Sequence, residues 1–304
     1  CEPLLTNYFP EALRENFFEE IKAHRLRREI IVTGLTNAML NRGGPAMAVR
    51  LADESGRGPG DVAAAFLIVS SVFHLPHLWH AVDALDGKMP GQAQLDLYLR
   101  IQDFLLEQVS GLLRTVPLGD LAATIANYRA GVEELSHVFG ECLTPAQLER
   151  VAASRQAMER SGATPEVAER IAALDVLSHA MTITRLARET NRPIMDAARI
   201  AFAASDYFHL DELKTLAAGL QIRDYFDRLA VNGAIYTLET ARRALSREVL
   251  HEAIGAADFA AWEREHGGRL ARAKMALDEI AATGDLTVSR LTVVASRVRD
   301  LTSV

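Results

Sequence analysis

Cysteine is scarce in this sequence of 304 residues, which contains only 2 cysteines, Cys1 and Cys142. Two cysteines cannot build the disulfide framework that holds small secreted domains together, so we expect a reducing, cytoplasmic compartment. Residues 1–20 contain neither a basic stretch nor a long apolar stretch, so we also expect no secretory signal peptide here. A first residue other than methionine suggests a piece of a longer chain.

Basic residues are also fewer than acidic ones. The chain has 33 lysines and arginines and 40 acidic residues, which gives a net charge of −7. Proteins that bind nucleic acid or anionic membranes carry a basic stripe, so we expect neither partner. The span from Val62 to Val82 has no formal charge, but its strictly apolar part covers only residues 62–69. A membrane-spanning helix needs about 20 mostly apolar residues. We therefore interpret this span as a buried core helix.

Signatures of common catalytic sites are missing as well. The sequence has no Gly-x-Ser-x-Gly, no Cys-x-x-Cys, no Walker lysine and no dinucleotide-binding fingerprint after a strand. The stretch GRGPGD, residues 56–61, has the glycines of a phosphate-binding loop, but a helical pattern precedes it. We expect no catalytic residue, no cofactor-binding residue and no metal site in this chain.

Helical periodicity is what the sequence does contain. Apolar residues from Phe226 to Val249 recur in steps of three and four, as on one face of an α-helix. TPAQ at 144 and TPEV at 164 each place a threonine cap before a proline, which is typical of a helix start. Glycines that are typical of helix ends follow other segments, namely Gly43, Gly44, Gly56, Gly162 and Gly284. The pattern predicts an all-α fold of about a dozen helices, packed as a multi-helix bundle or array.

An internal repeat divides the sequence. Residues 50–85 align without a gap on residues 185–220, at an offset of 135, and 13 of the 36 pairs are identical. Chance would give roughly three identities in a chain so rich in alanine and leucine. A long amphipathic helix follows each copy, at about 91–115 and about 223–251. We predict a first helical unit over 1–116, connecting helices over 117–163 and a related second unit over 164–304.

The stretch VFHLPHLWH, residues 72–80, places His74, His77 and His80 three residues apart, which is one way to build a metal site on a helix. Only His74 has a histidine counterpart in the repeat, His209, and both copies share the pattern Phe-His-Leu-x-x-Leu. A single residue between two helices, followed by an apolar one, is typical of a left-handed helix end, and histidine is enriched at positive φ. We therefore predict a helix junction at both histidines, with a metal site as the alternative.

The densest polar cluster is AHRLRREI, which contains His24, Arg25, Arg27 and Arg28. Three guanidinium groups within four residues form a possible docking or anion-contact site for a carboxylate, a phosphate or an acidic partner surface. The alternative is a solvated basic patch with Glu29 beside it.

Several motifs of the first 86 residues together have the pattern of a known family. They are Tyr8-Phe9-Pro10, the block from His24 to Ile31, Thr36-Asn37, Asn41-Arg42-x-Gly44, Phe73-x-Leu75-Pro76-x-Leu78-Trp79 and Ala84-Leu85-Asp86. With these motifs the chain resembles the C-terminal region of the large bacterial NAD-specific glutamate dehydrogenases. The resemblance weakens after about residue 115 but continues to the end of the chain, including RLARETNRPIMDAARIAF and LSREVL.

The resemblance implies a parent enzyme that converts L-glutamate and NAD to 2-oxoglutarate, ammonium and NADH, as a homo-oligomer in the cytoplasm. In that family the catalytic lysine and aspartate and the nicotinamide-binding fold lie upstream of such a segment. We therefore expect a non-catalytic helical region, without a cofactor of its own, that serves packing, oligomer assembly or regulation. Its expected partner is the catalytic part of the same polypeptide.

Two other classes of protein stay open. One is an independent helical-repeat adaptor that binds a protein partner in a groove. The other is a helix-bundle metal enzyme, which needs Glu-x-x-His ligand pairs from two helices. Glu134 and His137 have this spacing.

Overall fold

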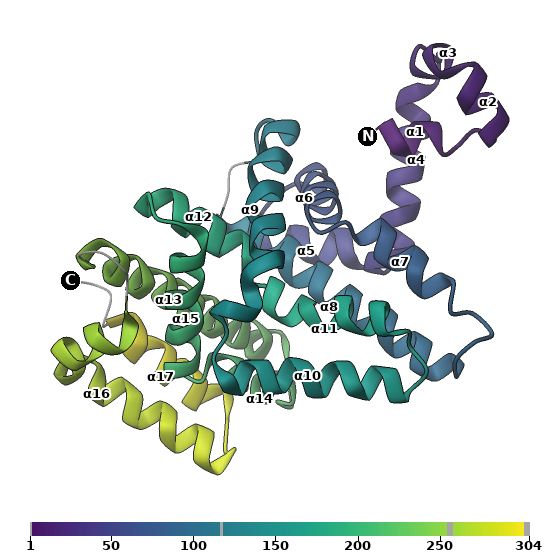
Figure 1. The fold of residues 1–304 in the computed structure, drawn as a ribbon. Helices are drawn as coiled ribbons and strands as arrows, with labels where there is room; N and C mark the ends of the chain where they lie inside the picture. Colours follow the sequence, from purple (N-terminus) through teal and green to yellow (C-terminus); the bar gives the residue numbers. More distant parts are fainter. Residues whose placement is uncertain (1, 116–117, 254–257, 301–304) are drawn as a thin grey trace. The chain divides into compact units, whose positions relative to one another are not determined.

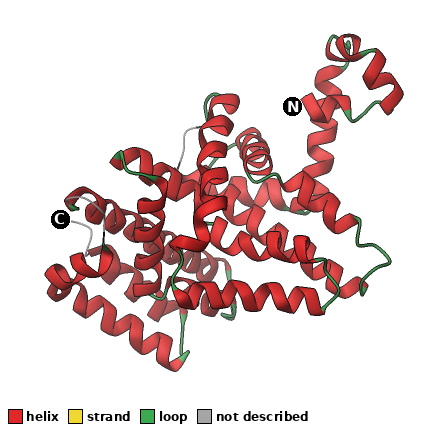
Figure 2. Cartoon of the chain, viewed as in Figure 1, coloured by secondary structure: helices red, strands yellow, loops and turns green. Residues whose placement is uncertain are grey.

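A computed structural model describes residues 2–115, 118–253 and 258–300 (Figure 1). Within these ranges the regular secondary structure consists of helices, and no strand occurs (Figure 2). The predicted all-α fold is confirmed. The helices number eighteen instead of about a dozen, partly because the first 38 residues divide into four.

Seventeen α-helices and one π-helix follow one another in the part of the chain that the structure describes. They are α1 (Glu2–Thr6), α2 (Glu11–Asn16), α3 (Phe18–Lys22), α4 (Arg27–Ala38), the π-helix η1 (Met39–Gly43), α5 (Met47–Ser55), α6 (Pro59–Val72), α7 (Leu75–Asp83), α8 (Gly91–Thr115), α9 (Leu121–Cys142), α10 (Pro145–Arg160), α11 (Pro165–Leu177), α12 (Ala180–Thr190), α13 (Ile194–Tyr207), α14 (Leu210–Ala218), α15 (Tyr225–Glu252), α16 (Phe259–Thr283) and α17 (Val288–Asp300).

The two predicted threonine caps lie at helix starts. Before α10, the Thr144 hydroxyl accepts from the Gln147 backbone N–H at 3.3 Å, and the Gln147 side chain accepts from the Thr144 N–H at 3.1 Å. This reciprocal pair is a capping box, which satisfies two backbone donors that the helix leaves open. Before α11, the Thr164 hydroxyl accepts from the Val167 N–H at 3.4 Å, and Pro165 begins the helix.

Left-handed residues end several helices, and the predicted histidine junctions are among them. His74 has φ 51° and ψ 36°, and His209 has φ 50° and ψ 35°. Each follows the phenylalanine that ends a buried helix, Phe73 of α6 or Phe208 of α13, and directly precedes the next helix, α7 or α14. The prediction of left-handed helix junctions at both histidines is confirmed.

Equivalent helices of the two aligned segments have corresponding bounds. The bounds of α6 and α13, and those of α7 and α14, each differ by 135 residues at both ends. The left-handed residues Gly56 and Asn191, which end α5 and α12, differ by 135 as well. The local geometry therefore repeats at the offset of the sequence pattern, while a common origin of the two segments stays a prediction.

The chain divides into two compact units, which are described separately. The first comprises residues 1–130 and 153–178, and the second residues 131–152 and 179–304. In the first unit α6 packs against α5, α7 and α8. In the second, α15 packs against α12, α13 and α17, and its buried side chains include Leu238, Leu245 and Val249.

No single helix within the described residues is long and apolar enough to cross a membrane. The pair α6 and α7 has the required length and composition only when taken together, and the two helices are bent by 72° at their junction. Val62, Ile68 and Val69 of α6 are fully buried inside the first unit. The prediction of a buried core helix at this position is confirmed.

Two left-handed helix ends predict different responses to glycine. Glycine lacks the Cβ that makes a left-handed backbone unfavourable by roughly 1 kcal/mol, and its larger unfolded-state entropy offsets most of that gain. We expect Asn191→Gly, at the left-handed end of α12, to change the free energy of unfolding by less than about 0.5 kcal/mol. His209→Gly also loses the 2.9 Å contact of Nε2 with Asp278 and the 3.3 Å contact of Nδ1 with Glu212, so it should destabilise by about 1–2 kcal/mol.

Urea unfolding of the parent and both variants measures this difference. Equal stability losses in the two variants would show that the contacts of His209 contribute nothing.

Candidate functional site

The first four helices form an N-terminal helical cluster, residues 2–38, with a small core of its own. In Figure 1 the short helices α1, α2 and α3 gather around α4. Its buried core consists of Leu5, Ile21 and Ile30, with Phe9 and Ile31 packed against them. Three buried side chains are few for the stability of a separate structure, so this cluster depends on additional packing.

Large apolar side chains lie on the outside of the N-terminal helical cluster. Tyr8 is 67% exposed and Val32 is 61% exposed. The other exposed apolar side chains of the cluster are Leu13, Phe17, Phe18 and Leu26. Scattered apolar side chains are normal on a surface, but six on one small cluster are typical of an interaction surface.

The predicted basic site begins in this cluster, in the turn between α3 and α4. His24 and Arg25 lie in the turn, and Arg27 and Arg28 occupy the first turn of α4. The three arginines are exposed, whereas His24 is half-buried with its ring against Phe9 at a centroid distance of 5.5 Å. His24 Nδ1 accepts from the Leu26 N–H at 3.2 Å, so Nε2 carries the proton and is the donor that the ring can offer.

The electrostatics of this site favour an anion. A helix N-terminus carries about half a positive charge, so Arg27 and Arg28 lie at the end of α4 where cations are unfavourable. None of the three arginines forms an ion pair with another residue that the structure describes, and the Arg27 side chain donates to the Lys22 carbonyl at 3.4 Å. A carboxylate or phosphate beside them would gain both from the guanidinium groups and from the helix end.

The histidines of residues 72–80 form no three-ligand group. His74 and His77 have stacked rings with centroids 6.0 Å apart, as expected for neighbours across a helix junction. Among the residues that the structure describes, the groups of three or more possible metal ligands do not include them.

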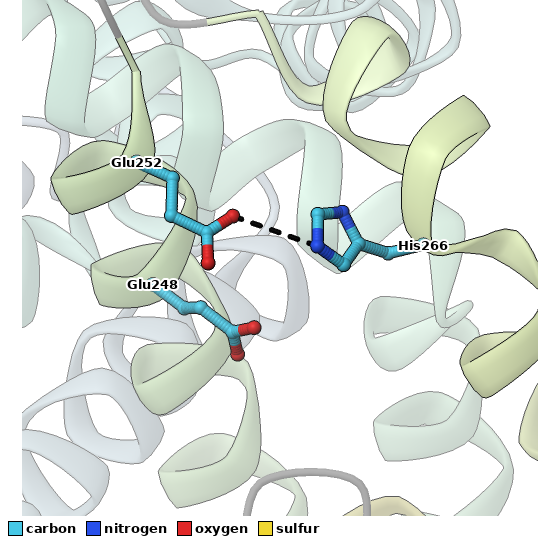
Figure 3. A group of neighbouring side chains, drawn as sticks. All are labelled: Glu248, Glu252 and His266. Carbon is cyan, nitrogen blue, oxygen red and sulfur yellow. Dashed lines mark ion pairs between the residues drawn. The ribbon is translucent and has the colours of Figure 1, made fainter.

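One group of metal-ligating side chains lies in the second unit instead (Figure 3). Glu248 and Glu252 are one turn apart at the end of α15, and His266 lies in α16. The ligand atoms of the three residues all lie within 4.8 Å of one another, and His266 Nε2 is 3.7 Å from Glu252 Oε2. Only part of this group can be predicted from the sequence. Two glutamates four residues apart on a helix can be recognised from their spacing, but their contact with a histidine on the next helix cannot.

A second charged group of this unit surrounds Arg242, which is 1% exposed. Its guanidinium donates to the Glu239 carboxylate at 2.7 and 3.1 Å, and Lys214 Nζ lies 2.6 Å from the same carboxylate. Burial alone would raise the pKa of Glu239, but the charges of Arg242, Lys214 and His179 hold that pKa well below its ordinary value.

Asp211 extends the ion pairs of this group. Its carboxylate lies 2.9 Å from Arg150 and 3.7 Å from His179. Burial alone would raise the pKa of Asp211, but His179, Lys214 and Arg150 together lower it to about 2. Because each carboxylate faces a cation of the same unit, we interpret these ion pairs as structural.

The sequence of the chain can be compared with known proteins. A family described as "Glutamate dehydrogenase, C-terminal" matches residues 1–300. The NAD-specific glutamate dehydrogenase of Halomonas elongata is 28% identical over 278 residues, which cover 90% of this chain and 17% of that protein. The NAD-specific glutamate dehydrogenase of Mycobacterium tuberculosis is 29% identical over 313 residues, 98% of this chain and 18% of that protein. The chain thus spans less than a fifth of the length of these relatives.

The low pKa of Asp211 predicts a pH dependence of stability. A carboxyl whose pKa is lower in the folded than in the unfolded state stabilises the fold above the unfolded value of about 3.9, and this contribution is lost as pH falls towards about 2. We expect the free energy of unfolding of the parent to fall more steeply between pH 4 and pH 2 than that of Asp211→Asn. Urea unfolding at three pH values gives the slopes. Asp53→Asn, at an exposed carboxylate outside this group, is the control and should keep the parent slope; an unchanged slope in Asp211→Asn would contradict the assignment.

Proposed function

Because this chain belongs to the glutamate dehydrogenase C-terminal family, we propose that it is the non-catalytic helical region of a large NAD-specific glutamate dehydrogenase. The parent enzyme converts L-glutamate and NAD to 2-oxoglutarate, ammonium and NADH, as a cytoplasmic homo-oligomer. The role of this region is packing and assembly. It holds no NAD itself, and its partner is the catalytic part of the same polypeptide.

The N-terminal helical cluster is the surface through which this region docks. The observation that carries the proposal is the combination of exposed apolar side chains with arginines at the start of α4. A cluster with three buried core residues gains stability when a partner covers its apolar exterior. The arginines select an acidic partner surface, because cations at a helix N-terminus become favourable only when anions neutralise them.

The relatives indicate where that partner comes from. The chain spans 17% and 18% of the two relatives described above, so most of such a polypeptide lies outside it. A partner on the same polypeptide has a high effective concentration, so a modest interface is sufficient.

The first prediction from this proposal concerns catalysis by the chain alone. We expect no saturable NAD binding and no NADH production from L-glutamate, because the described residues contain no strand and therefore no nicotinamide-binding βαβ unit. Calorimetric titration with NAD and absorbance of NADH at 340 nm, with a full-length family member as the positive control, test both expectations. Saturable NADH production by the chain would refute the proposal.

The second prediction concerns Arg25, Arg27 and Arg28. Replacing all three by alanine should change the stability of the isolated chain by less than about 1 kcal/mol, because these exposed side chains form no ion pair with the residues that the structure describes. In the full-length enzyme the same triple variant should weaken subunit assembly at least about tenfold, since each charge-assisted hydrogen bond across an interface contributes about 1.5–3 kcal/mol.

Two matched variants make this experiment specific. Alanine at Arg160, Arg170 and Arg228, three exposed arginines outside the N-terminal helical cluster, removes the same charge and should leave assembly unchanged. Lysine at Arg25, Arg27 and Arg28 keeps the charge but not the planar fork, and should give an intermediate effect. Unaltered assembly of the alanine variant, measured by sedimentation over a dilution series, would favour the solvated basic patch.

A further inference from the structure

The group formed by Glu248, Glu252 and His266 has the composition of a metal site. It brings two carboxylate oxygens and one imidazole nitrogen within 4.8 Å, from two different helices (Figure 3). Two ligands at about 2.0–2.2 Å from a tetrahedral zinc ion are roughly 3.3–3.6 Å apart. The separation of 3.7 Å between His266 Nε2 and Glu252 Oε2 is close to that requirement.

The imidazole of His266 is already oriented for a ligand at Nε2. Its Nδ1 lies 3.0 Å from the backbone carbonyl of Trp262, one turn earlier in α16. A carbonyl only accepts, so Nδ1 carries the hydrogen and Nε2 is the nitrogen that faces Glu252. The indole of Trp262 stacks on the imidazole at a centroid distance of 4.3 Å and an angle of 14°, which limits rotation of the ring.

The carboxylate of Glu252 has an outer partner as well. Trp262 Nε1 donates to Glu252 Oε2 at 2.6 Å. Trp262 therefore orients His266 through its backbone carbonyl and Glu252 through its indole N–H. Hydrogen bonds of this kind orient metal ligands in proteins and are part of the site.

Electrostatics also favour a cation here. Glu248 and Glu252 lie in the last turns of α15, where the helix end is already partly negative. His266 Nε2 lies close to the Glu252 carboxylate, and either a bound proton or a bound metal ion at Nε2 makes this approach favourable. A nitrogen and two oxygens suit zinc or a similar divalent transition metal better than calcium or magnesium, which prefer oxygen ligands alone.

We propose that Glu248, Glu252 and His266 bind one divalent transition-metal ion, of the zinc class, which joins the end of α15 to α16. Three protein ligands leave a fourth position for water. The site is separate from the N-terminal helical cluster, so its test is independent of the proposed docking function.

The two tryptophans of the sequence, Trp79 and Trp262, give a direct assay. In a Trp79→Phe background Trp262 is the single tryptophan, and it stacks on the proposed ligand His266. Cobalt(II) bound at Nε2 should quench its fluorescence. We expect the tag-free, chelator-treated 304-residue chain to show saturable quenching at one cobalt per chain, together with visible absorption of tetrahedral cobalt. Zinc should reverse both signals.

Three variants test the ligand assignment in the same background. His266→Gln and Glu248→Gln should each weaken cobalt binding by about tenfold or more, because each removes a direct ligand. His251→Gln removes an exposed histidine next to Glu252 that is outside the group, so it should bind as the parent does.

Thermal unfolding provides a second readout. Zinc should raise the unfolding temperature of the parent and of His251→Gln but not that of His266→Gln, because only a metal bound to the native state stabilises it. Circular dichroism checks that each variant is folded. If His266→Gln does not fold, Glu248→Gln replaces it as the ligand variant. The proposal is overturned by non-saturable quenching in the parent, or by equal cobalt affinity in the parent and both ligand variants. Either result would leave a protonated His266 paired with Glu252.

Discussion

A protein made of helices has to satisfy the backbone groups and the partial charges at the end of every helix. The first four N–H groups and the last four carbonyls of each helix have no partner within it. No strand in the described ranges accepts them, so turns, caps and side chains must do so. At the junctions of α6 with α7 and of α13 with α14, a phenylalanine caps the end of a buried helix and a left-handed histidine caps the start of the next. Both buried helices keep their place in a core because the chain turns within these two residues.

Charged side chains at helix ends either match or oppose the partial charge of that end. Asp224 and Asp258 lie at the starts of α15 and α16, where their carboxylates accept from backbone N–H groups and match the positive helix end. Arg27 and Arg28 at the start of α4 and the glutamates at the end of α15 have the opposite, unfavourable sign. Each such charge costs about 0.3–1 kcal/mol near the surface, and a bound counter-charge reverses the sign. The proposed docking surface and the proposed metal site therefore have the same motivation, a charge of unfavourable sign at a helix end.

The sequence was a reliable guide wherever a feature depends on neighbouring residues. The caps at Thr144 and Thr164 and the left-handed histidines follow from side-chain chemistry within four residues, and the structure has them where they were predicted. Contacts between distant segments could not be predicted in this way. The pairing of Glu252 with His266 depends on how α15 and α16 pack, and no spacing in the sequence encodes that. The role of the basic block stays a prediction, because the spacing of its arginines does not encode what they contact.

His74 and His209 show that the backbone of a turn and the side chain placed there are separate requirements. Their backbone angles agree within 1°, and the residues before them, Phe73 and Phe208, have the same angles. The turn requires a residue that tolerates positive φ, and glycine or asparagine would meet that requirement. The His209 imidazole does more than this, because it contacts carboxylates on both sides, with Asp278 of α16 at 2.9 Å from Nε2 and Glu212 at 3.3 Å from Nδ1. At His209 a second helix supplies a partner for the imidazole, so contacts beyond the turn add a use that the backbone alone does not require.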